Sequence, residues 1–374
     1  MRVRYLFGFT LTVILFVGFS TIVSGQEKTT KSFGVKKGDN LSLKVNGDVK
    51  VESWSKDEVY IEVSGVRRSN IELLKIKQNE NTILIDFVAN EATFLIKTPE
   101  QFNLDIKTSG GDITCSGKYL GNVKSSTSGG DIQVEKVTGD VVLSTSGGDI
   151  MTGDIEGNLK VATSGGDIKV GNISGEGKLS TSGGDIIVAS SNKTLSLATS
   201  AGDIKVGTVN GNLSVATSGG DIVVGNVNGA AKLNTSGGDV KLSGAKGNSR
   251  VISSGGELKL ENLFGSVKAS TSGGKVYVEL NPDGSEESRI ATSGGNITFL
   301  IPETAKATIE AVIAVQSKKD LNDVFSIVSD YKIDDYSVDE DRKEIRAKIF
   351  LNGGGKLISL NTVNSQIAVR KLNK

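Results

Sequence analysis

The sequence contains no histidine and very little cysteine, proline or aromatic side chain. Its 374 residues include one cysteine, three prolines and 5% Phe, Trp and Tyr. The absence of histidine excludes Ser-His and Cys-His catalysis, and it excludes every His metal ligand. Since Cys115 has no second cysteine to pair with, the chain has no internal disulfide. We therefore assign no catalytic, cofactor-binding or metal-binding residue and expect no cofactor.

The charges of the chain balance. Lys and Arg number 43, and Asp and Glu also number 43. A chain without an excess of either sign gives no reason to expect nucleic acid or an anionic membrane surface as its partner. We expect instead an unidentified protein or polysaccharide of the cell envelope or cell surface.

The first residues have the layout of a secretory signal peptide. They read MRVRYLFGFTLTVILFVGFSTIVSGQ, with Arg2 and Arg4 ahead of an apolar run and small residues before Gln26. This pattern predicts a signal peptide over residues 1–25, cut after Gly25. The alternative is an uncleaved membrane anchor, because the run is just long enough to span a bilayer. We expect an exported protein that is periplasmic, cell-surface or extracellular, with membrane contact only if the segment is uncleaved.

A hexapeptide of the type TSGGDI recurs through most of the chain, usually every 18 residues. It starts at Thr108, Thr127, Thr145, Thr163, Thr181, Thr199, Thr217, Thr235, Ser253, Thr271 and Thr292. A fixed period over this length is the mark of a solenoid. Numbered from the Thr, positions 6, 8, 15 and 17 are mostly apolar, as in Ile204, Val206, Leu213 and Val215. Alternation with period two predicts β-strands.

The predicted fold is therefore all-β, a single-stranded parallel β-helix or β-solenoid of 18-residue coils, with a right-handed coil favoured. Successive coils stack in parallel about 4.8 Å apart, like residue over like. Residues 108–300 form the repeats, between a β-rich N-terminal cap or first coils at 26–107 and a β-rich C-terminal cap at 301–374. The C-terminal cap contains a polar, acidic insertion at 317–345, which we expect to be a solvated loop. The closing segment, LNGGGKLISLNTVNSQIAVRK, should cap the far end or add a last coil.

The hexapeptide itself is interpreted as a corner that sets the register. The alternation directs the threonines inward as a ladder, whose hydroxyls bond along the column or to the backbone: Thr145, Thr163, Thr181, Thr199, Thr217 and Thr235. The paired glycines are expected to have positive φ, and the Asp or Ser to cap loose N–H groups in an Asx-type turn. Calcium binding by the outward Asp column is an alternative, but calcium-binding β-rolls need an Asp rhythm of nine residues. Ice binding would need outward threonines.

The chain also resembles a known family. The segments GDVKVESWSKDEVYIEV, IKTPEQFNLDIKTSGGDI and GGGKLISLNTVNSQIAV, with the TSGGDI coils between them, are similar to the bacterial putative-adhesin family of β-strand-repeat proteins, a domain of unknown function. The resemblance covers roughly residues 33–371. It implies a parallel β-helix at the cell envelope or outside the cell, and it supplies no catalytic residues.

Two classes of function remain open at this stage. The first is a structural or adhesin-like interaction protein without catalytic activity, which the sequence does not distinguish from an envelope assembly factor. The alternative is a polysaccharide-binding or carbohydrate-active β-helix, a lyase or hydrolase that uses Asp with Lys or Arg. Departures from the repeat are the best candidates for an interaction surface, so we select Phe264, Lys275 and Tyr277 in the stretch 253–291.

Overall fold

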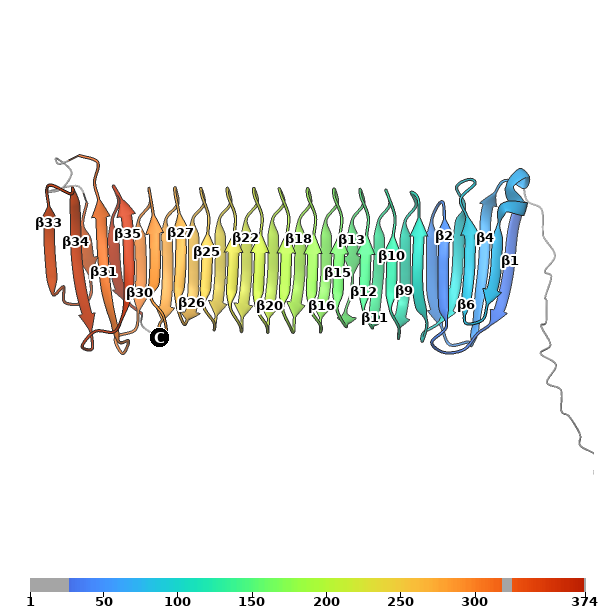
Figure 1. Ribbon diagram of the computed structural model, residues 1–374, viewed down its shortest axis with the longest axis horizontal. Helices are drawn as coiled ribbons and strands as arrows, with labels where there is room; N and C mark the ends of the chain where they lie inside the picture. Colours follow the sequence, from blue (N-terminus) through green and yellow to red (C-terminus); the bar gives the residue numbers. More distant parts are fainter. Residues whose placement is uncertain (1–26, 318–324, 373–374) are drawn as a thin grey trace, which may run out of the picture.

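The computed structural model describes residues 27–317 and 325–372, and almost all of them belong to a long two-sheet solenoid (Figure 1). The predicted signal peptide at 1–25 lies outside the described residues. Among those described, no helix has the length and apolar character needed to cross a membrane.

The strands form two sheets that run the length of the rod. The first, sheet A, contains in spatial order β1 (Glu27–Gly34), β4 (Glu58–Val66), β7 (Thr93–Pro99), β3 (Val49–Trp54), β9 (Ile113–Tyr119), β11 (Ile132–Thr138), β13 (Ile150–Thr152) with β14 (Ile155–Glu156), β16 (Ile168–Ile173), β18 (Ile186–Ser191), β20 (Ile204–Val209), β22 (Ile222–Val227), β24 (Val240–Ala245), β26 (Leu258–Phe264), β28 (Val276–Asn281), β30 (Ile297–Ile301), β36 (Ile367–Lys371) and β32 (Ile327–Ser329).

The second, sheet B, contains β5 (Lys75–Asn79), β6 (Thr82–Phe87), β2 (Asn40–Val45), β8 (Asn103–Thr108), β10 (Val123–Ser126), β12 (Val141–Ser144), β15 (Leu159–Ala162), β17 (Gly177–Ser180), β19 (Leu195–Ala198), β21 (Leu213–Ala216), β23 (Ala231–Asn234), β25 (Ser249–Ile252), β27 (Val267–Thr271), β29 (Ser288–Thr292), β35 (Lys356–Val363), β31 (Ala307–Ala314), β34 (Glu344–Leu351) and β33 (Asp335–Asp339). The 3-10 helix η1 (Arg68–Leu73) joins β4 to β5.

Each regular coil contributes one strand to each sheet, and the predicted register is confirmed. In sheet A, Ile186 pairs with Ile204, and Ile204 pairs with Ile222, one repeat further along. In sheet B, Leu195 pairs in the same way with Leu213. All of these are parallel pairings between residues 18 apart, so the all-β parallel solenoid expected from the period is what the chain forms.

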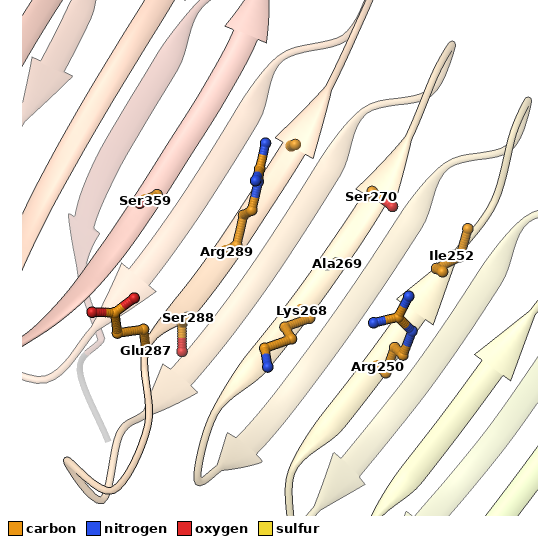
Figure 2. Close-up of a pocket in the computed structure, with 10 residues that line it drawn as sticks. Arg250, Ile252, Lys268, Ala269, Ser270, Glu287, Ser288, Arg289 and Ser359 are labelled. Carbon is orange, nitrogen blue, oxygen red and sulfur yellow. The ribbon is translucent and has the colours of Figure 1, made fainter.

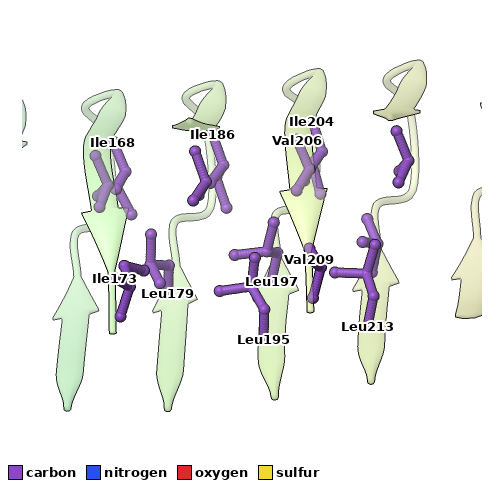
Figure 3. Close-up of a cluster of buried hydrophobic side chains, with 14 of the residues drawn as sticks. Ile168, Ile173, Leu179, Ile186, Leu195, Leu197, Ile204, Val206, Val209 and Leu213 are labelled. Atoms are coloured by element: carbon purple, nitrogen blue, oxygen red, sulfur yellow. The ribbon is translucent and has the colours of Figure 1, made fainter. Parts of the chain in front are cut away.

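The apolar positions of both sheets meet in one continuous core. In the coil that begins at Thr199, the side chains of Ile204, Val206, Leu213 and Val215 are all buried. Figure 3 shows such side chains from successive coils filling the space between the two sheets. Because an isolated coil would leave these groups in water, each coil depends on its neighbours for stability.

The inward threonine ladder is also confirmed. The six threonines named above are 5–7% exposed, and each hydroxyl donates to the carbonyl of the fourth-position glycine of the preceding coil at 2.9–3.0 Å. The same oxygen accepts the N–H of its own fourth-position glycine at 3.2–3.4 Å. Each threonine thus satisfies its hydroxyl and ties two coils together.

The reason proposed for the paired glycines was wrong. None of the paired glycines of the hexapeptides, all of which the structure describes, has positive φ. A Cβ on the fourth-position Gly220 would instead lie 2.1 Å from the carbonyl oxygen of Gly202, whereas one on the third-position Gly219 would lie 3.3 Å from that of Ala201. Glycine is needed at the fourth position because successive backbones approach too closely for a side chain, and the third position accommodates Ala201.

The aspartates cap backbone N–H groups, but between coils rather than in a local turn. The Oδ1 atom of each accepts the N–H of the residue one coil further on, as between Asp203 and Asp221 at 2.7 Å. The column runs from Asp48 and Asp112 to Asp239, which accepts the N–H of Glu257 at 2.7 Å.

The coils at both ends are not stacked in chain order, which the sequence did not predict. At the N-terminal end, β2 lies between β6 and β8, so the first coil of the chain is inserted between two later ones. At the other end, β35 lies between β29 and β31, so the C-terminal segment lies within the stack and does not form the cap. The terminal edge of sheet B is β33, which pairs only with β34 among the described strands.

The acidic stretch 317–345 also differs from the solvated loop that we expected. Residues 327–329 and 335–339 form β32 and β33, and β34 begins at Glu344. The carboxylate of Asp334 accepts the N–H of Phe350 at 2.8 Å, which anchors the connection to β33. Part of the stretch, residues 318–324, lies outside the described residues.

Candidate functional site

The three residues selected from the sequence lie along neighbouring strands of sheet A but do not converge. Tyr277 pairs with Lys259 near the start of β28, while Phe264 lies across from Asn281 at the far ends of the same strands. That places them about 13 Å apart along the strand direction. Lys275 lies at the corner before β28 and forms an exposed ion pair with Glu257 at 3.5 Å. Their role as an interaction surface remains a prediction.

Tyr277 does belong to a small polar network that the sequence did not reveal. Its hydroxyl donates to Oε1 of Glu279 at 2.8 Å, and Glu279 is 9% exposed. Burial, followed by the hydrogen bond to Glu279, raises the pKa of Tyr277 to about 12. The other carboxylate oxygen of Glu279 accepts the N–H of Asn262 at 3.3 Å. These contacts explain why an acid is tolerated here, and the network stabilises a β-bulge in β26.

The outer face of sheet B carries charge of one sign along the regular coils. We call the outer face of the ten strands from β10 to β29 the basic face. The sequences of these strands contain no Asp, no Glu and no aromatic residue. They contain seven cations, all outward and exposed at position 16 or its equivalent: Lys124, Lys160, Lys178, Lys232, Arg250, Lys268 and Arg289.

Four of these cations occupy consecutive coils, and we call them the basic row. Strand pairing places Lys232 beside Arg250, Arg250 beside Lys268, and Lys268 beside Arg289. Neighbours in parallel strands are about 4.8 Å apart. Among the described residues, the row forms one ion pair, between Lys268 and Glu286, at 3.9 Å between side chains that are 55% and 52% exposed. Such a long, solvated pair neutralises little.

A shallow hollow of about 600 Å³ lies over the basic row (Figure 2). Arg250, Lys268 and Arg289 line it, and Ile252, Ser270 and Ala291 form its floor at position 18, where every coil carries a small or medium-sized residue. A second hollow shares these three floor residues and continues to Asn361 and Glu344 of the C-terminal coils. Cations thus project beside a floor of small side chains, which is a geometry that can hold an extended anionic ligand.

The hollow lies beside the insertion that interrupts the repeat. Residues 282–287 lengthen the connection from β28 to β29, and Glu287 lines the hollow. The turn is held by Asp283, which accepts both the N–H and the hydroxyl of Ser285, at 2.9 and 2.6 Å. These two bonds hold the pKa of Asp283 below its usual range. Part of the hollow falls in the stretch 253–291, but Phe264, Lys275 and Tyr277 do not line it.

The acidic column offers no metal site among the described residues. Its members are exposed, but each Oδ1 from Asp48 to Asp239 is engaged by a backbone N–H. Within the same residues, no three Asp, Glu, His or Cys side chains are grouped so that they could hold a metal ion. The column is explained by its capping of the corners.

Cys115 lies in the core. Its side chain is fully buried in β9, and burial raises the pKa of its thiol to about 12. A thiol in this state is a poor nucleophile, so its contribution is to packing.

The sequence matches one family model over most of its length. The model described as Toastrack DUF4097 matches residues 38–210 and again residues 190–316. No curated protein is similar to the chain in sequence.

Several solved structures resemble the chain only distantly. One is a putative adhesin from Bacteroides fragilis, 12% identical, covering 92% of this chain and 97% of that one with a TM-score of 0.24. Another is a putative adhesin from Parabacteroides merdae, 12% identical, covering 92% and 96% with a TM-score of 0.25. A putative lipid binding protein from Parabacteroides distasonis is 16% identical and covers 73% and 94%, with a TM-score of 0.25. At these scores the likenesses bear on neither ligand nor mechanism. From the family match, together with the stacked TSGGD corners, the chain belongs to the Toastrack DUF4097 family.

Proposed function

We propose that this protein is an exported, non-catalytic binding protein of the adhesin-like kind, a rigid rod that presents the basic face of sheet B to a partner at the cell envelope or outside the cell. The observation that carries the proposal is the charge bias of that face. In a chain with equal numbers of acids and bases, ten consecutive strands of one sheet contain seven exposed cations and no acid.

The architecture supports binding over catalysis. The coils from Thr127 to Thr235 repeat the same corners and the same core, so their chemistry is spread evenly along the rod. An active site would need a local departure with converging groups, whereas a binding face gains from repetition because many weak contacts act together. The N-terminal segment MRVRYLFGFTLTVILFVGFSTIVSG supports export.

The test compares two triple variants with the same change in charge. In the first, Arg250, Lys268 and Arg289 are each replaced by Ser, a residue that the chain itself uses at the same position in Ser196 and Ser214. In the control, Lys169, Lys205 and Lys241, which are exposed on the outer face of sheet A, are replaced by Ser.

Fluorescently labelled protein without residues 1–25 is incubated with intact cells and with envelope fractions of the source bacterium. The basic-face variant should lose most of its binding, and the control should keep it. Equal binding by all three proteins would refute the proposal. A reporter enzyme active only outside the cytoplasm, fused after Lys374, tests export separately.

A further inference from the structure

The seven cations of the basic face follow a straight line along the rod. Strand pairing runs without interruption from Lys124 through Lys178 and Ser214 to Arg289, always at position 16 or its equivalent. Ten strands at this spacing extend over about 45 Å. A ligand that uses several of these cations must therefore be extended and must carry negative charge along its length.

The cations are available to such a ligand. Lys232, Arg250 and Arg289 are exposed and form no ion pair or hydrogen bond with other described residues, and Lys268 has only the long contact to Glu286. Guanidinium groups at two of the four positions of the basic row suit carboxylate or phosphate, which they can bind with two parallel hydrogen bonds.

Acids on both sides reduce the positive surface to a strip. On one side, Asp140 and Glu176 lie two residues before the position of the row, and Glu287 lines the hollow. On the other side, the acidic column follows the corners of the coils. Asp221 and Asp239 are its members in the coils that contain Lys232 and Arg250. A planar anionic surface such as a membrane would bring its charges against these acids as well, whereas a single polymer chain can follow the strip alone.

The face also lacks what a nucleic acid would use. Binding of single strands relies on aromatic side chains against which bases stack, and the ten strands contain none. The hollow over the basic row instead offers small polar groups beside the cations, including Ser270 and Ser359. Hydroxyl groups of this kind can exchange hydrogen bonds with sugar hydroxyls.

From these observations we infer that the basic face binds a linear acidic polysaccharide, with the polymer axis parallel to the rod and successive anionic groups contacting cations of successive coils. This inference rests on the proposed function and specifies its ligand class. The basic row is the strongest part of the site. Lys124, Lys160 and Lys178 add contacts beyond the gap at Ser196 and Ser214.

The experiment uses the full exported chain and short and long oligogalacturonates, which carry one carboxylate per sugar, as probes in calorimetric titrations. Binding should tighten with oligomer length, because a longer chain reaches more cations, and should weaken at high salt. The substitution of Arg250, Lys268 and Arg289 by Ser should weaken it by about tenfold or more, since each exposed pair contributes a fraction of a kcal/mol to about one. The control variant of sheet A should bind like the wild type.

Three comparison ligands test whether the site prefers an acidic polysaccharide. Neutral dextran should not bind, and phosphatidylglycerol vesicles and single-stranded DNA should bind more weakly than long oligogalacturonate at equal charge. The inference would be overturned by preferential binding of vesicles or DNA. It would also be overturned if the basic-face variant and the sheet A control lost oligogalacturonate binding equally. If oligogalacturonates fail while envelope binding still depends on the basic face, the ligand class is wrong and the proposed function stands; if the basic-face variant also binds envelopes like the wild type, both fall.

Discussion

Replacing Gly220 by Ala should destabilise the solenoid far more than the same change at its neighbour Gly219. Both residues belong to one hexapeptide, and neither has positive φ. A Cβ at residue 220 would lie 2.1 Å from the carbonyl oxygen of Gly202, well inside contact distance, and one at residue 219 would lie 3.3 Å from that of Ala201. The pair therefore separates the effect of close stacking from the effect of backbone conformation.

The cost at residue 220 has two sources. Forcing an extra methyl group into a packed site costs about 1–3 kcal/mol. The coils must also move apart at the carbonyl of Gly202, which accepts the hydroxyl of Thr217 at 3.0 Å, and weakening that hydrogen bond costs about 0.5–1.5 kcal/mol. Since Ala also reduces the entropy of the unfolded chain, worth about 0.4–1 kcal/mol, we expect a net loss of about 2–3 kcal/mol for Gly220→Ala. Gly219→Ala should be close to neutral.

Urea unfolding followed by circular dichroism gives the overall effect, and hydrogen exchange of the amides in β20 and β22 gives the local one. Both are needed because long repeat arrays depart from two-state unfolding. Gly220→Ala should lower the urea midpoint and speed exchange in these two strands, whereas Gly219→Ala should leave both near wild type. Equal midpoints and equal exchange in the two variants would refute close stacking as the reason for the fourth-position glycine.

Other substitutions test the remaining contacts. Thr217→Val should cost about 1–3 kcal/mol in unfolding free energy because it leaves the Gly202 carbonyl without its partner; Thr217→Ser should cost much less, since Ser253 makes the same bond to Gly238 at 3.0 Å, and a neutral Val variant would contradict this. Asp203→Ala should cost about 0.5–1.5 kcal/mol by freeing the N–H of Asp221, while Asp203→Asn, which keeps an acceptor, should unfold like the wild type. The Cys115 thiol is buried, and burial raises its pKa to about 12. Maleimide at a pH well below 12 should therefore label this thiol only after the protein unfolds. Rapid labelling of the native protein would contradict its burial.

The central coils could be predicted because the same pattern of apolar residues and glycines recurs in each of them. Alternation at positions 6, 8, 15 and 17 specified two strands per coil, and the shared period specified which residue pairs with which, as in Ile186 with Ile204. The inward direction of Thr217 followed from the same alternation. The φ angle of Gly220 did not follow, since a left-handed corner and close backbone stacking both select glycine, and only coordinates distinguish them.

The ends could not be predicted for a different reason. The strands of the first coil, β2 and β3, have the same alternation as any other strands, and alternation does not specify a neighbour once the period is lost. The insertion of β2 between β6 and β8 depends on tertiary packing. In the acidic stretch, the sequence of β33, DYSVD, does not predict a strand because it begins and ends with a charged residue. The sequence of its partner β34, EIRAKIFL, alternates clearly between apolar and polar residues.

The cations of the basic row recur at one position of the repeat, but the net charge of the whole chain, which is zero, does not reveal them. Inward positions are constrained by the core in every coil, so their residue types are nearly fixed and carry no information about a partner. Position 16 is free of that constraint: it accepts Lys, Arg, Ser and Val, as Lys178, Arg250, Ser214 and Val142 show. Flanking acids such as Asp140 and Glu176 favour a base over an acid at this position within the fold itself, and its exposure leaves that base open to a partner as well. The anionic ligand that we propose would use the same cations.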